Sequence, residues 1–374
     1  MSVYVAGTMG SDSISVLPVK TGTTVISFAG NDVLDGSKAT SELNLLGGSG
    51  NDSYHINMWD ETVIYDTGGT NDTLYLHLTK AELGTIISKG GFHGVLEGKH
   101  YVLSLDGNTL LTIANYSGQG AIENVVSSDG VAMSFSAFVE AVGGGALRQL
   151  TTADLGADHS NYDNYLYYID HVFPFYSSLE DTYAKYATPV WFDSESYMSS
   201  KIAEMNGTMS YSQLEAAFRD SGFIGRDGLY VHYEQYGQWE DVSPLALFDS
   251  NYYFRSKAAA VNNIDISRVT DVQIQAMHDA IHAAGMNAWT HYERYGTQEG
   301  IDASAQFDTS AYMKAKLAQV QQSDPSYTEA QLYQAFRDGG LSAVAHYQAY
   351  GKDEGITLAG VSTTDAGIPV EVDA

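Results

Sequence analysis

The chain has 374 residues, of which 44% are hydrophobic, so it can bury the cores of more than one domain. Its 46 acidic and 18 basic side chains give a formal net charge of −28, which makes nucleic acid and anionic membrane surfaces poor partners and divalent cations good ones. The sequence contains no cysteine, which excludes disulfides and thiolate metal sites, and no apolar run long enough to span a membrane.

The composition changes near the glycines at 143–145. Residues 1–148 contain 22 of the 37 glycines but only six of the 27 tyrosines. The glycines and the polar residues that follow them are typical of a linker. We therefore expect a multidomain chain with a parallel β-roll or β-solenoid at 1–78, its β-cap at 79–142, a linker at 143–160, an all-α domain of short helical repeats at 161–360 and an acidic tail at 361–374.

Strands are expected throughout the first 78 residues. Four-residue runs of apolar and β-branched residues begin at Val25, Leu43, Thr62 and Thr73, and glycine, asparagine and aspartate turns separate them. No helical periodicity appears before Lys80.

An aspartate recurs every 20 residues in this region, at Asp12, Asp32, Asp52 and Asp72. Each lies in the same local frame, in which a small residue and Asn or Ser precede the aspartate and an apolar residue follows two positions later. A fixed period with two strands per unit predicts a solenoid whose coils stack on one another.

Stacked coils place these carboxylates in one column, about 4.8 Å apart. Like charges at that spacing repel, so the column needs cations or solvent. Carboxylate and carbonyl oxygens without sulfur or imidazole are the ligands that Ca²⁺ prefers. The alternative is a solenoid with solvated Asn-Asp turns and no metal.

Residues 47–55 match the nonapeptide Gly-Gly-x-Gly-x-Asp-x-U-x completely, and here the chain resembles the RTX family of calcium-binding β-roll proteins, which bacterial type I systems secrete. The resemblance implies that Gly48, Gly50 and Asp52 form a ligand-presenting turn and that Tyr54 points inward. This chain departs from the family in its 20-residue coil, where the family has 18, and in alternate turns that lack the glycine-aspartate core.

We therefore expect one to three calcium ions on one edge of the roll. The hairpin expected around Asp106 and Gly107, followed by residues 121–125, is similar to the β-cap of RTX rolls. The candidate ligand residues are those of the four aspartate turns: Asp12, Gly30, Asn31, Asp32, Gly48, Gly50, Asn51, Asp52, Gly69, Asn71 and Asp72.

A second repeat occupies the tyrosine-rich half. Phe-Asp pairs begin at residues 192, 248 and 307, and a His-Tyr-x-x-Tyr-Gly motif follows each of them, at His232, His291 and His346. We expect about three short helices per unit, with the motif histidines and tyrosines packing helices together and the final glycine as a helix C-cap. The pattern is similar to tyrosine-rich repeats beside RTX segments in large secreted bacterial proteins.

Catalytic motifs are weak in this chain. His278 and His282 lie on one helical face, as in His-Glu-x-x-His zinc proteases, but Asp279 stands in place of the glutamate. The repeat also aligns His278 with Arg219 and Arg337, which indicates a surface position. No nucleophile elbow or phosphate-binding loop is present. We expect no enzyme.

These observations favour a secreted, calcium-dependent structural protein that self-assembles into a homo-oligomer or polymer at the bacterial cell surface or in the extracellular matrix, as a surface layer, filament or biofilm scaffold. The alternatives are a calcium-dependent adhesin or carbohydrate-binding module, with cell-surface polysaccharide as its partner, and a secreted hydrolase whose site is scattered. The residues from Met1 to Gly7 lack a signal-peptide pattern. We expect type I export through a signal in the acidic C-terminus.

Overall fold

The computed structural model describes residues 3–18, 22–58, 61–89, 92–97, 100–105, 108–114, 122–143, 148–149 and 168–356. The chain divides into two compact units. The first contains Met1–Ala187 and Arg219–Gly228, and the second contains Thr188–Phe218 and Leu229–Ala374. The chain therefore changes unit after Ala187, after Phe218 and after Gly228.

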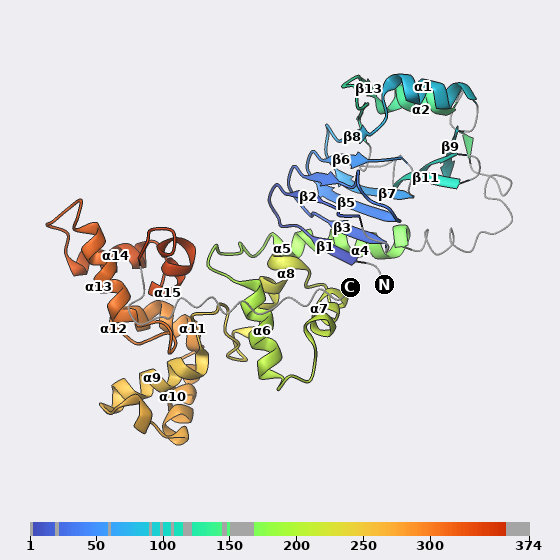
Figure 1. The fold of residues 1–374 in the computed structure, drawn as a ribbon. Coiled ribbons are helices and arrows are strands. Elements are labelled where there is room, and N and C mark those ends of the chain that lie inside the picture. Colours follow the sequence, from blue (N-terminus) through green and yellow to red (C-terminus); the bar gives the residue numbers. More distant parts are fainter. Residues whose placement is uncertain are drawn as a thin grey trace. The chain divides into compact units, whose positions relative to one another are not determined.

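The first unit is built on a parallel β-solenoid, as the 20-residue period predicts (Figure 1). Val3 pairs with Thr23 and Thr23 with Leu43, so these coils advance by 20 residues, whereas the step from Leu43 to Thr62 is 19. One sheet contains β1 (Val3–Ala6), β3 (Thr23–Ile26), β5 (Leu43–Ser49) and β7 (Thr62–Gly68). The other contains β2 (Ser13–Ser15), β4 (Val33–Asp35), β6 (Ser53–Ile56) and β8 (Thr73–Leu76).

The core of the solenoid consists of residues that repeat with the coils. Alternate residues of β6 and β8 are buried, as expected for strands with one face in a core. Burial of each large apolar side chain contributes about 1.5–3 kcal/mol, so the stack of inward residues holds neighbouring coils together. The fully buried members include Val25, Leu45 and Ile64 from one sheet and Leu34, Tyr54 and Leu74 from the other.

Further strands extend both sheets after the last coil. β11 (Asn108–Ala114) pairs in parallel with β7, and β10 (His100–Leu105) pairs antiparallel with β11 and with β9 (Phe92–Glu97). The second sheet continues through β12 (Asn124–Val126) and β13 (Ala132–Ser134). Two helices, α1 (Lys80–Lys89) and α2 (Phe135–Gly143), add to the strands expected here. The expected hairpin turn at Asp106 and Gly107 lies outside the described residues.

The expected linker is described only in part. Arg148 and Gln149 form β14, which pairs in parallel with β9. A π-helical turn, η1 (Tyr168–Val172), and the helices α4 (Phe173–Ser178) and α5 (Glu180–Tyr183) follow. Their aromatic residues pack on the solenoid, because the Phe173 and Tyr65 ring centroids lie 5.7 Å apart and those of Tyr183 and Phe28 lie 5.2 Å apart.

The second unit contains most of the three helical repeats (Figure 1). No helix within the described residues is long and apolar enough to cross a membrane. The first repeat runs through α6 (Ser194–Glu204), α7 (Tyr211–Asp220), α8 (Gly225–His232) and η2 (Tyr233–Gly237). The second contains α9 (Ser250–Asn262), a 3-10 turn η3 (Ile266–Arg268), α10 (Asp271–Ala283), α11 (Ala288–His291), η4 (Tyr292–Gly296) and α12 (Thr297–Glu299). The third contains α13 (Thr309–Val320), α14 (Glu329–Asp338), α15 (Ala343–His346) and η5 (Tyr347–Gly351).

The repeat motifs hold each repeat together through the same contacts. The Phe-Asp aspartates cap the first helix of each repeat, as Asp249 does by accepting the Tyr252 backbone N–H at 2.9 Å. The motif histidine pairs through Nδ1 with a buried tyrosine hydroxyl of that first helix. These pairs are Tyr197 with His232 at 2.6 Å, Tyr253 with His291 at 2.6 Å and Tyr312 with His346 at 2.7 Å.

The motif glycine is not a helix C-cap, so that expectation is wrong. Gly296 has φ −58° and lies inside continuous helical backbone, in a π-helical turn that continues into α12. The reason for glycine is space, because a Cβ atom on Gly296 would lie 2.7 Å from the Tyr253 hydroxyl. The left-handed C-cap is instead Gly300, with φ 66°.

Candidate metal centre

The four repeating aspartates form a continuous ladder along the solenoid. The backbone N–H of Asp12 donates to Asp32 Oδ1 at 2.7 Å, that of Asp32 donates to Asp52 Oδ1 at 2.8 Å, and that of Asp52 donates to Asp72 Oδ1 at 2.7 Å. Glu123 ends the ladder by accepting the Asp72 N–H at 2.6 Å. One oxygen of each inner carboxylate is therefore committed to the backbone, and the other remains for a ligand.

The repeating asparagines form a separate ladder on the exposed side of the turn. Asn31 Oδ1 accepts the Asn51 N–H at 2.9 Å, and Asn51 Oδ1 accepts those of Thr70 and Asn71 at 2.9 and 3.1 Å. Asn71 Oδ1 accepts a hydrogen bond from the Asn124 side chain at 3.0 Å. These amide oxygens connect neighbouring coils and do not join the buried carboxylates.

The glycines of the turn leave room that a side chain would fill. Gly50 has φ 133°, and a Cβ atom there would overlap the Gly30 carbonyl of the neighbouring coil. Gly48 has φ 89° and lies against the Phe28 carbonyl and the Glu180 carboxylate. Gly30 and Gly69 lie beside the Asp32 and Asp72 carboxylates, respectively.

Three aspartates converge at the end of the ladder. One carboxylate oxygen from each of Asp52, Asp66 and Asp72 lies within 4.8 Å of the other two, and all three residues are buried. Two oxygens bound to one Ca²⁺ at about 2.3–2.6 Å lie at most about 5 Å apart, so the three can share an ion. Asp66 is held by Tyr54, whose hydroxyl donates to Oδ2 at 2.6 Å, and by the Gly68 N–H, which donates to Oδ1 at 2.8 Å.

Several buried oxygens in and beside this cluster have no hydrogen-bond partner. Within the described part of the chain, the Oδ2 atoms of Asp32, Asp52 and Asp72 accept no hydrogen bond, although each of these residues is at most 1% exposed. Glu180 Oε1 is buried in the same way, while its Oε2 accepts from the Ser49 hydroxyl at 2.8 Å. Buried polar atoms are rarely left without a partner, and a bound cation supplies one.

The electrostatics of these carboxylates also favour a bound cation. Burial raises the pKa of Asp32 and Asp72 to about 6, that of Asp52 to about 7 and that of Asp66 to about 8. Burial also raises the pKa of Glu180. Because the carboxylates are removed from water and repel one another, their protonation begins at a higher pH than in the unfolded chain, and a bound cation that compensates their charge would oppose this.

The residues fit calcium better than other metals. The donor set consists of carboxylate oxygens, with no imidazole or sulfur, and these are the ligands of hard divalent cations. Asp52, Asp66 and Asp72 would hold the ion, and the carboxylates of Asp32 and Glu180 add negative charge beside it. The Asp12 carboxylate lies at the edge, where its Oδ2 already accepts the Thr8 N–H at 2.6 Å.

Sequence reasoning missed Asp66 and Glu180. Asp66 lies opposite Gly48 in the register of β5 and β7, where the regular register shifts. An acidic residue inside a strand, two positions before the glycines of a ligand turn, was a usable signal for Asp66. Glu180 carried no such signal, because only the packing of α5 brings it to Ser49, 131 residues away in sequence.

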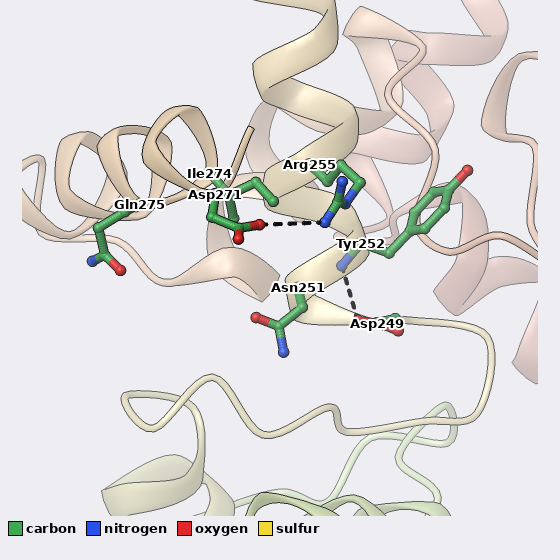
Figure 2. Close-up of a pocket in the computed structure, with 7 residues that line it drawn as sticks. All are labelled: Asp249, Asn251, Tyr252, Arg255, Asp271, Ile274 and Gln275. Atoms are coloured by element: carbon green, nitrogen blue, oxygen red, sulfur yellow. Dashed lines mark hydrogen bonds and ion pairs between the residues drawn. The ribbon is translucent and has the colours of Figure 1, made fainter. Parts of the chain in front are cut away.

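The second unit has a polar pocket of about 460 Å³ beside α9 and α10. Figure 2 shows Arg255 facing Asp271, with a closest N–O distance of 3.9 Å, and Asp249 beneath the N–H of Tyr252. Because Asp249 and Arg255 already contact other groups of the protein, the pocket supports a ligand site less strongly than the carboxylate cluster does. It is lined by Asp249, Asn251, Tyr252, Arg255, Asp271, Ile274 and Gln275.

Comparison with known proteins adds no assignment to this geometry. No known protein-family profile matches the chain, and no curated protein matches its sequence at a significant level.

Proposed function

We propose that this chain is a secreted, calcium-dependent structural protein that self-assembles at the bacterial cell surface or in the extracellular matrix. The observation that supports this most directly is the set of buried, unpartnered oxygens of Asp32, Asp52, Asp72 and Glu180. They lie in or beside the turns that resemble RTX repeats, so calcium is the ligand that both the sequence and the donor chemistry favour.

In this proposal, calcium couples to folding of the roll. The ion compensates carboxylates that otherwise repel one another across the coils, so its binding free energy becomes folding free energy. An affinity of roughly 10⁻⁴–10⁻³ M, as in extracellular calcium modules, keeps the chain loose in a low-calcium cytosol and folds it outside. Strands β9–β13 then act as the β-cap that closes the last coil.

The helical repeats supply the contacts between subunits in this proposal. The second tyrosine of each His-Tyr-x-x-Tyr-Gly motif is about half exposed, at 50% for Tyr236 and 47% for both Tyr295 and Tyr350. Tyrosine is enriched in protein interfaces, because its ring buries area while its hydroxyl keeps a hydrogen bond. Three equivalent tyrosines on a repeated scaffold form a periodic surface suited to self-association.

Electron microscopy and light scattering of the full chain, with calcium and with chelator, test this function. We expect ordered assemblies in millimolar calcium and dispersed chains after chelation. The variant Asp52→Asn should need more calcium for assembly, whereas Glu140→Gln, which removes an exposed charge from α2, should behave as the parent chain does. A chain that binds calcium but remains monomeric at high concentration contradicts the self-assembly role.

A carbohydrate-binding role is the second candidate, and one groove favours it. This groove of about 480 Å³ in the second unit is lined by Trp191, Tyr230, Trp289 and Tyr350, together with polar residues such as Glu234. Aromatic rings beside carboxylates and amides are typical of sugar-binding surfaces. Binding of defined glycans by a monomer, lost in Trp289→Ala, favours this role over assembly.

A further inference from the structure

The histidines of α10 meet an aspartate from a distant loop. His278 Nε2 lies 3.1 Å from Asp241 Oδ2, and His282 Nε2 lies 3.3 Å from the same oxygen. The two imidazole rings stack with centroids 4.1 Å apart, as expected for residues four apart on a helix. The side chains are partly shielded, with 32% of His278, 24% of His282 and 16% of Asp241 exposed.

We propose that Asp241, His278 and His282 form a site for a divalent transition metal of the Zn²⁺ class, separate from the calcium cluster. In a tetrahedral zinc site with bonds of about 2.0–2.2 Å, neighbouring ligand atoms lie about 3.3–3.6 Å apart. The two nitrogen–oxygen distances are close to this spacing. Imidazole nitrogens select transition metals over calcium, so the two metal centres differ in the ion they take.

His278 presents one ring nitrogen to each of two carboxylates. Its Nδ1 lies 3.0 Å from Asp279 Oδ1 and 3.3 Å from the Gln275 amide nitrogen, which also donates to Asp279 Oδ1 at 2.9 Å. A neutral imidazole carries one N–H, so its other nitrogen offers a lone pair. When Nδ1 donates to Asp279, the Nε2 lone pair is directed at the Asp241 carboxylate, and a cation between them joins the two acceptors. A zinc-binding imidazole usually donates its other N–H to a carboxylate, a carbonyl or water, and Asp279 is placed to accept it here.

All three ligand residues are departures from the repeat. Asp241 has φ 56° where the other repeats have Gly300, with φ 66°, and Gly355, with φ 73°. His278 aligns with Arg219 and Arg337 of the other repeats, as the sequence shows. α10 has 13 residues whereas α7 and α14 have ten, and His282 lies in the additional turn.

The three residues differ from the repeat at separate positions, yet their side chains meet at one point. Packing alone does not explain this. The left-handed backbone at Asp241 is tolerated by aspartate but favours glycine, so the side chain is retained there at an energetic cost. Aromatic residues hold the imidazoles in place, since the Phe254 ring lies edge-on to His278 at 5.3 Å. A bound ion joins the loop after η2 to α10, and thus connects the first repeat to the second. Three protein ligands leave the fourth position for water.

Calorimetric titration of the full chain with Zn²⁺, in excess calcium that saturates the carboxylate cluster, tests this site. We expect one zinc ion per chain, with affinity at least about tenfold weaker in His282→Gln and in Asp241→Asn. Asp279→Asn, which removes the carboxylate beside His278 Nδ1, should weaken binding about 10–100-fold. The matched control is His171→Gln, an exposed histidine of the first unit, which should leave zinc binding unchanged.

A second measurement keeps the test independent of folding. Co²⁺ in place of Zn²⁺ should give the intense visible absorption of a four-coordinate site in the parent chain and lose it in Asp241→Asn. Circular dichroism of the variants without zinc should match that of the parent chain, because the changed side chains are partly exposed. The proposal is overturned if the parent chain binds no zinc, or if all variants bind zinc as tightly as the parent chain does.

Discussion

The roll and the helical repeats both arise from repeated sequence, but repetition has opposite electrostatic consequences in the two units. In the roll, identical copies stack directly, so each aspartate adds a buried carboxylate to the same column and the charge accumulates. In the helical unit, the repeated motif residues pair with one another inside each repeat, as Tyr253 does with His291. The stacked aspartates thus create a demand for cations, whereas the repeated Tyr–His pairs do not.

The two units also differ in where a metal cluster can form. In the roll, the candidate site lies mainly on repeated positions such as Asp52 and Asp72. In the helices, the three candidate ligands lie where the second and first repeats depart from the pattern. A search for repeated residues therefore finds the first cluster, and a search for exceptions within a repeat finds the second.

Removing calcium should give the largest difference in stability between the two units. We expect chelation to abolish the amide protection of β3 to β8 in the full chain while α9 to α14 remain protected. At a calcium concentration 100 times Kd, the ion contributes about 2.7 kcal/mol to the stability of the roll. Hydrogen exchange read by mass spectrometry reports both units in one sample. Unchanged exchange in the roll after chelation contradicts the calcium assignment.

The variant Gly50→Ala should destabilise the roll by about 2–4 kcal/mol. Alanine at φ 133° is strained, and its Cβ would overlap the Gly30 carbonyl. Gly84→Ala is the matched control, since this glycine lies within α1 with open space around it. That change should stabilise the chain by about 0.5–1 kcal/mol through helix propensity. Thermal unfolding in calcium compares the two, and equal effects would show that the turn has no special geometry.

The variant Asp52→Asn should stabilise the roll without calcium and destabilise it with calcium. Without the ion, it removes one buried charge from a column of like charges and should raise the midpoint of unfolding. With the ion, it removes a ligand and should weaken calcium binding at least about tenfold, or about 1.4 kcal/mol. Unfolding curves at several calcium concentrations should therefore cross those of the parent chain. A variant that is less stable under both conditions argues for a purely structural aspartate.

The variant Tyr253→Phe should destabilise the helical unit by about 1–2 kcal/mol, and this loss should not depend on calcium. It removes the hydroxyl that pairs with His291 Nδ1 at 2.6 Å and leaves that nitrogen buried without its partner. The control Tyr295→Phe changes a half-exposed tyrosine and should have little effect. Denaturant unfolding monitored by helical circular dichroism measures both. Equal stability of the two variants would mean that the Tyr–His pairs do not hold the repeats together.

The sequence was sufficient to predict the solenoid, because strand pairing follows the repeat period directly. Asp12, Asp32, Asp52 and Asp72 stack as their 20-residue spacing indicates. Tyr54 is fully buried, as the nonapeptide match implies. These successes share one cause, since a parallel register depends only on the length of the coil.

What the sequence could not predict depends on chain segments outside the repeats. Glu180 reaches the cluster only through the packing of α5, and Asp241 meets His278 only because the loop after η2 folds onto α10. The motif glycine has the local pattern of a C-cap, which is why the sequence alone is misleading there. Its actual role, space for the Tyr253 hydroxyl at Gly296, requires knowledge of a tertiary contact.

Acid should weaken the helical unit through the motif histidines. Burial lowers the pKa of His232 to about 4 and also lowers those of His291 and His346, from 6.5 in the unfolded chain. Between pH 6.5 and 4 the unfolded chain therefore binds more protons than the folded one. The contribution to stability is complete above pH 6.5 and declines as the pH falls, since ∂ΔG/∂pH is positive there.

The size of this effect is reduced at His232 and His346, because solvent reaches both side chains and screens their charge, whereas His291 is only 8% exposed. Before this screening, a difference of one pKa unit between the folded and unfolded chain represents roughly 1.36 kcal/mol. Region-resolved hydrogen exchange at pH 7 and pH 4.5, corrected for the intrinsic rate, should show lower protection of α6, α9 and α13 at the acidic pH. Replacing His291 by Gln, whose amide can still accept the Tyr253 hydroxyl but does not titrate, should reduce this dependence in α9 while leaving α6 and α13 as they were. If α9 loses protection equally in parent and variant, its acid sensitivity originates from other groups.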